Sequence, residues 1–96
     1  MTARDVLAGI YHHLASSEGR LGPGAERTRV AIKRARVRIE GLLGDPPVEG
    51  GSPEGEPMAH LEEGDALARG RLGGTGLEGQ IRRAVSDALS AAREEL

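Results

Sequence analysis

The clearest helical pattern in the chain lies in residues 2–19, TARDVLAGIYHHLASSEG. Thr2 is a good N-cap residue, and an acid three positions later, Asp5, favours the start of a helix. Large apolar side chains then recur every three or four positions, as Val6, Leu7, Ile10, Tyr11 and Leu14. Gly19 is placed for a left-handed stop. The pattern predicts an amphipathic helix with one buried stripe.

A second helix is predicted from residue 25 to residue 43, after a Gly-Pro-Gly turn at 22–24. On a helical wheel its apolar and small residues gather on one third of the circumference. The alternation of Val30 with Ile32 suggests a strand, but a second alternating pair at 37 and 39 has the opposite parity. One continuous strand would send the two pairs to opposite faces. Residues 1–43 are therefore predicted to form a hairpin of two amphipathic helices.

The third predicted helix covers residues 77–96. Thr75 and Glu78 have the spacing of a capping box directly before an apolar run. Four large side chains, Leu77, Ile81, Val85 and Leu89, follow helical spacing, and alanines at 84, 88, 91 and 92 lie beside them. Because alanines let a neighbouring helix approach closely, this amphipathic helix is predicted to lie against another helix.

The middle of the chain does not look like a core. Residues 44–57, GDPPVEGGSPEGEP, hold four prolines and four acids, and we expect a disordered acidic linker. Residues 58–76 are predicted to be a weak helical segment, interrupted by Gly64, followed by a Gly-rich hinge. The expected fold class is all-α, a small bundle of about three helices with the disordered linker between them.

The composition suggests that the core of a single chain is too small to stabilise this bundle alone. The 96 residues include one aromatic side chain, Tyr11, and no cysteine. A single domain of this length is near the lower limit at which one core suffices, and no disulfide is available. We therefore expect assembly with another copy or with a partner. The absence of a signal-like or membrane-spanning run predicts a cytoplasmic location, and the ratio of twelve Arg to one Lys suggests a bacterial or phage genome.

The function expected first is that of a non-enzymatic assembly or adaptor protein. It would form a homo-oligomer or dock on a protein partner, and residues 58–69 could order on binding. Val30 and Val37 lie one above the other on a charged face, outside the main stripe of their helix. The predicted interface residues are Val30, Val37, Leu77, Ile81, Val85 and Leu89. No Ser–His–acid pattern suggests catalysis.

The alternative function is nucleic-acid binding through residues 27–38, which contain six cations. These are Arg27, Arg29, Lys33, Arg34, Arg36 and Arg38. Six cations are enough to neutralise several phosphates. They spread over more than half of the wheel, however, and the chain lacks aromatic residues for base stacking. Residues 44–65 carry seven acids and no base, so the acidic tract 46–56 could fold back and mask the basic helix.

No metal site or other cofactor is predicted within one chain. His12 and His13 are adjacent, so on a helix they point about 100° apart. His60 and Glu63 form an i,i+3 pair, but two ligands are too few without help from elsewhere. Only a symmetric oligomer that brought several His13 side chains together would supply a site. The glycines at 70–79 lack the lysine of a phosphate-binding loop, so no small-molecule substrate is evident.

Overall fold

The computed structural model describes residues 2–44 and 55–96, and these form four α-helices and no strand. The helices are α1 (Ala3–Glu18), α2 (Glu26–Leu43), α3 (Pro57–Arg71) and α4 (Gly76–Glu95). The all-α fold class is confirmed, but the bundle has four helices where three were predicted. Ten residues of the predicted linker, 45–54, lie outside the described residues.

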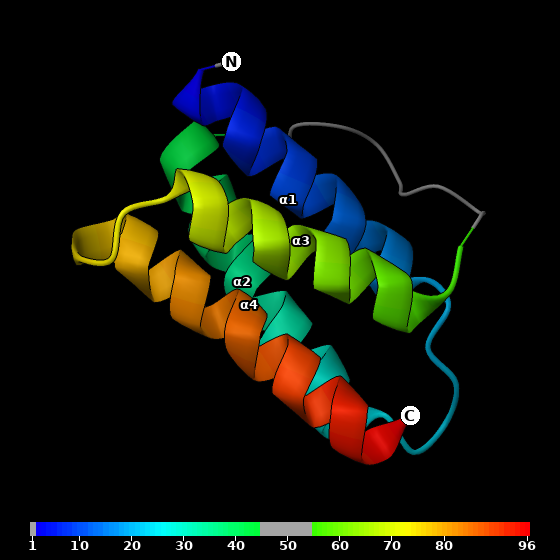
Figure 1. Cartoon of the computed structure of the whole chain (residues 1–96). Coiled ribbons are helices and arrows are strands. Elements are labelled where there is room, and N and C mark those ends of the chain that lie inside the picture. The colour runs from blue at the N-terminus through cyan, green and yellow to red at the C-terminus, as the bar shows by residue number, and fades with distance from the viewer. Residues whose placement is uncertain (1, 45–54) are drawn as a thin grey trace.

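The four helices form a closed ring in which each helix packs on two others (Figure 1). α1 lies against α2 and α3, and α4 lies against the same two helices on the other side. Neighbouring helices run antiparallel. The Ser17 hydroxyl at the end of α1 donates to the carbonyl of Pro57 at the start of α3 (3.0 Å). Arg4 at the start of α1 reaches the carbonyl of Leu43 at the end of α2 (3.4 Å).

The predicted first helix is confirmed at its start and differs at its end. The Thr2 hydroxyl accepts from the amide of Asp5, and the Asp5 carboxylate accepts from the amide of Thr2, both at 3.2 Å. All five predicted apolar side chains of α1 are buried. The expected left-handed stop at Gly19 is wrong, because its φ is −66°. Instead, amides after the helix turn back onto the carbonyls of Ser17 and Glu18 and tighten the last turn.

The segment predicted to be weak is a full helix, α3. Pro57 occupies its first turn, where a missing amide hydrogen costs nothing. Leu61 and Ala68 are completely buried. Gly64 lies between them on the buried face, and a Cβ there would be 3.4 Å from the Cβ of His13 on α1. The glycine that was predicted to interrupt the helix thus lies inside it, on the face that packs against α1.

The start of α4 also differs from the prediction. Thr75 is the N-cap residue, but its side chain accepts no capping hydrogen bond. The predicted capping box is wrong because the Glu78 carboxylate bonds to the hinge instead, where it accepts from the amide of Gly73 (2.7 Å). The contact between Glu78 and Gly73 therefore stabilises the turn between α3 and α4.

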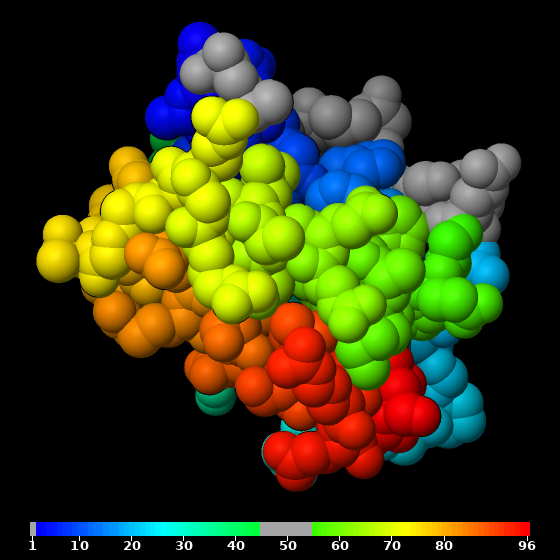
Figure 2. Space-filling view, viewed as in Figure 1, coloured from blue at the N-terminus to red at the C-terminus, as the bar shows by residue number. Residues whose placement is uncertain are grey.

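The core runs through the centre of the ring and is larger than the sequence suggested. Most of the predicted core residues are buried, and Leu61 and Leu72 from the α3 region join them. Leu42, Leu77 and Leu96 are exposed. In Figure 2, side chains of α3 and α4 cover most of α2 from this side. Within the described residues, every helix is too short or too polar to cross a membrane.

Candidate functional site

The predicted interface on the last helix is mostly part of the core. Ile81 and Val85 are fully buried and Leu89 is 4 % exposed, all within a single chain. α2 and α3 supply the neighbouring helices that we expected from another copy. We call the row of large side chains on α4, Leu77, Ile81, Val85 and Leu89, the α4 stripe. Its burial corrects the expectation that this row is open to a partner. Only Leu77 remains exposed, beside Leu42 in a shallow hollow at one end of the bundle.

The two valines outside the main stripe of α2 are accessible, as the wheel predicted. Val30 is 47 % exposed and Val37 is 54 % exposed. Val30 lines a hollow between α2 and α4, whereas Val37 is not among the residues that line it. The structure therefore places Val30 next to a candidate binding surface.

That surface is a groove between the outer faces of α2 and α4, formed by two adjoining hollows that share Ala31, Arg34 and Asp87. Its floor consists of small buried side chains, Ala31, Ala84 and Ala91. Its basic wall is formed by Arg27, Arg34, Arg38 and Arg83, and its acids are Glu26 and Asp87. We call this surface the α2–α4 groove.

Three of the six predicted nucleic-acid-binding cations are already held by acids of the same chain. Arg27 makes two hydrogen bonds to the Glu94 carboxylate (3.1 and 3.2 Å). Arg29 pairs with Glu26 at 2.8 Å. Arg36 pairs with Glu18. The basic helix is therefore less available to phosphates than its sequence suggests.

Arg36 is the most firmly held of the three. It donates to the hydroxyl of Tyr11 (3.0 Å), and its guanidinium lies 5.0 Å from the Tyr11 ring centre. The Tyr11 hydroxyl in turn donates to Glu40 at 2.5 Å. Burial, and then the hydrogen bond to Glu40, raise the pKa of Tyr11 above its usual value. Arg36 thus joins α1 to α2 in a network that stabilises the fold.

The other three cations have no acidic partner among residues 2–44 and 55–96. These are Lys33, Arg34 and Arg38, and Arg83 of α4 shares this property. Arg34, Arg38 and Arg83 line the same half of the groove. An anionic group placed there would meet three guanidinium groups and one carboxylate, that of Asp87, above an apolar floor. The excess of positive charge suits carboxylates or phosphates.

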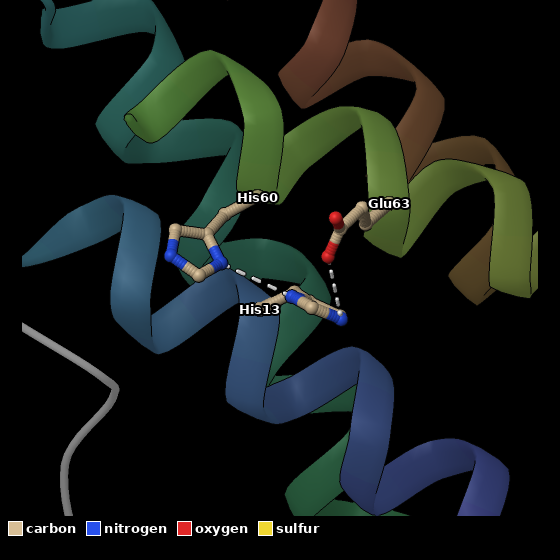
Figure 3. Close-up of side chains that lie close together, drawn as sticks. All are labelled: His13, His60 and Glu63. Carbon is tan, nitrogen blue, oxygen red and sulfur yellow. Dashed lines mark hydrogen bonds and ion pairs between the residues drawn. The ribbon is translucent and has the colours of Figure 1, made fainter. Parts of the chain in front are cut away.

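A second cluster lies on the other side of the bundle, between α1 and α3. His13, His60 and Glu63 point toward one another there (Figure 3). Burial lowers the pKa of His13, with smaller contributions from the neighbouring histidines, while Glu63 acts in the opposite direction. The sequence analysis paired His60 with Glu63 and considered His13 only as a ligand shared between copies, because only the packing of α1 on α3 brings His13 near the pair.

No protein-family model matches this chain, and no curated protein or solved structure shows significant similarity to it.

Proposed function

We propose that this chain is a non-enzymatic adaptor that docks an acidic, amphipathic segment of a partner protein in the α2–α4 groove. The observation that carries the proposal is the pairing of an alanine floor with three arginines that lack acidic partners in the described structure. The alanines give a helix or extended segment room to approach, and Val30 adds apolar contact at the rim.

A partner other than a second copy is favoured by the core. The large side chains of the α4 stripe are already sheltered, so a single chain does not need self-association to bury them. The groove instead offers charge complementarity. Carboxylates of the partner would reach Arg34, Arg38 and Arg83, and apolar side chains would meet the alanine floor. Self-association remains an outcome that the test below distinguishes.

The test is fluorescence anisotropy with a labelled amphipathic peptide of about 18 residues that carries leucines on one face and glutamates elsewhere. We expect saturable binding that weakens at least tenfold in the double variant R34E/R83E. The control is R71E on the exposed end of α3, which makes the same type of charge change away from the groove. Absence of binding, or an equal loss in R71E, would refute the groove as the docking site.

Nucleic-acid binding is the second candidate, and one observation favours it. Lys33, Arg34 and Arg38 are exposed on α2 and have no acidic partner in the described part of the chain. A labelled DNA duplex and a single-stranded RNA, tested in the same assay, separate the two functions. Affinity for a nucleic acid that falls steeply with salt, without peptide binding, would replace the adaptor proposal.

Light scattering addresses self-assembly. An adaptor is expected to have the mass of one chain, 10.1 kDa, and a melting temperature independent of its concentration. A dimer that dissociates in R34E/R83E would instead make a second copy the occupant of the groove.

A further inference from the structure

All three histidines of the chain gather on one side of the bundle. His12 and His13 come from α1, and His60 comes from α3. The ring centres of His13 and His60 are 5.4 Å apart, and those of His12 and His60 are 6.5 Å apart. These are the only histidines in the sequence, and they come from two helices that are far apart along the chain. Their proximity suggests a shared chemical role.

The close approach of α1 and α3 makes this meeting possible. Gly64 leaves out the Cβ that would otherwise touch His13, and Gly9, one turn earlier on α1, faces Leu67 in the same way. Because the helices run antiparallel, His13 lies opposite residues 60–64 of α3. His60 and Glu63 are three positions apart and so share the face of α3 nearest to His13.

The distances among the three side chains are short. Nδ1 of His13 lies 3.1 Å from Nδ1 of His60, and Nε2 of His13 lies 3.5 Å from a carboxylate oxygen of Glu63. Each residue can offer one ligand atom so that all three atoms lie within 4.8 Å of one another. A tetrahedral zinc ion with bonds of about 2.0–2.1 Å holds its ligand atoms about 3.3 Å apart. Side-chain rotations that bring the widest pair closer by at most about 1.5 Å would meet that requirement.

The chemistry of the set is specific. Two imidazole nitrogens and one carboxylate oxygen suit zinc and its neighbours in the first transition row, whereas calcium and magnesium prefer oxygen ligands throughout. The histidines are half-buried, and Glu63 is exposed and able to adjust. An ion there would have three protein ligands and an open side toward solvent for a water molecule.

We infer that His13, His60 and Glu63 form a binding site for one divalent transition-metal ion of the zinc class, which joins α1 to α3 within a single chain. This site is separate from the α2–α4 groove and does not depend on the proposed adaptor function. It also differs from a site shared between copies, because one chain supplies all three ligands.

The test uses the full chain, stripped of metal with a chelator and titrated with Zn²⁺ in a calorimeter. We expect one Zn²⁺ per chain and a higher melting temperature when it is bound. H13Q and H60Q should each weaken Zn²⁺ binding about tenfold or more. The matched control is H12Q, which removes the adjacent histidine and should leave binding within about threefold of the original. Circular dichroism of the metal-free variants confirms that each one folds.

Three results would overturn the assignment. Zn²⁺ that leaves heat and melting temperature unchanged would show that the cluster is only a polar contact between helices. Equal losses in H12Q and H13Q would show that the ligands are not the three named here. A doubling of mass on addition of Zn²⁺, seen by light scattering, would place the ion between chains. Absorption of bound Co²⁺ in the visible range gives an independent readout of tetrahedral coordination by these ligands.

Discussion

The carboxylate of Glu95, in the last turn of α4, caps the first turn of α2 through Thr28. One of its oxygens accepts from the Thr28 amide at 2.7 Å and from the Thr28 hydroxyl at 2.6 Å. The other oxygen accepts from the amide of Arg27 at 3.0 Å. Ala25, the N-cap residue of α2, has no side chain that could do this. An acid that is distant in sequence therefore satisfies amides that a local cap would normally satisfy.

Removal of this cap should destabilise the protein. We expect E95A to lower the melting temperature by about 5 °C, because two amides and a buried hydroxyl lose their acceptor. Thermal unfolding followed by circular dichroism measures the change. The control is E94A, which removes the exposed ion pair with Arg27 and should lower the melting temperature much less. Equal effects of the two substitutions would mean that the contact between Glu95 and Thr28 contributes little.

The cap should also make stability depend on pH. The hydrogen bond from the Thr28 side chain, helped by the two backbone amides, lowers the pKa of Glu95 below its ordinary 4.5. The folded state thus binds this proton less readily than the unfolded state does. The stabilisation is present above about pH 4.5 and is lost as the pH falls through the folded pKa. Asp5 adds to this trend, because hydrogen bonds with Thr2 lower its pKa as well.

Melting curves from about pH 7 to about pH 3 test this dependence. The original protein should lose more stability over this range than E95Q, in which the side chain at 95 does not titrate. Parallel curves for the two proteins would contradict the assigned role of Glu95.

Two glycines on packed helices should respond in opposite ways to alanine. Gly64 has room, since a Cβ would make an ordinary contact at 3.4 Å with His13. We expect G64A to leave stability unchanged or raise it by up to about 1 kcal/mol through better helix propensity. Gly79 has no room, since a Cβ would lie 2.6 Å from the carbonyl oxygen of Gly74. We expect G79A to lower the free energy of unfolding, measured with urea, by about 1–3 kcal/mol. A gain in stability in both variants would contradict the close approach of Gly79 to Gly74.

The burial of the α4 stripe can be tested by comparing a substitution at a buried position with one at an exposed position. I81A should lower the free energy of unfolding by about 2–5 kcal/mol, because it opens a cavity at a fully buried position. V37S changes a side chain that is 54 % exposed and should stay within about 0.5 kcal/mol of the original. Both values come from chemical denaturation. A mild effect of I81A would mean that α4 is not packed as described.

Much of the fold could be predicted from the sequence because local signals were strong. The cap at Thr2 and the 3/4 spacing of α1 and α2 follow from chemistry within a few residues, and they place those helices correctly. α3 was underestimated because its stability comes from Leu61 and Ala68 buried against other helices, and because Gly64 lies on the packed face without breaking the helix. Neither property is visible in helix propensity or periodicity alone.

The candidate sites were less predictable, because they depend on which helices meet. In the sequence, the six cations of α2 appear only as one group. The structure divides them into three that are held by Glu18, Glu26 or Glu94 and three that have no acidic partner in the described residues, of which Arg34 and Arg38 line the groove. Likewise His13 and His60, 47 positions apart, meet only through the antiparallel packing of α1 on α3. Contacts between distant segments depend on tertiary packing, which a single sequence does not reveal.

The ring arrangement determines how two ligands would influence each other. The cluster of His13, His60 and Glu63 lies at the α1–α3 contact and the groove at the α2–α4 contact, on opposite sides of the ring. Among the described residues, α1 makes no close contact with α4, and α2 makes none with α3. No helix contributes to both sites, and the core between them is already packed. Occupancy of one site should therefore leave affinity at the other nearly unchanged, a coupling free energy close to zero in both directions.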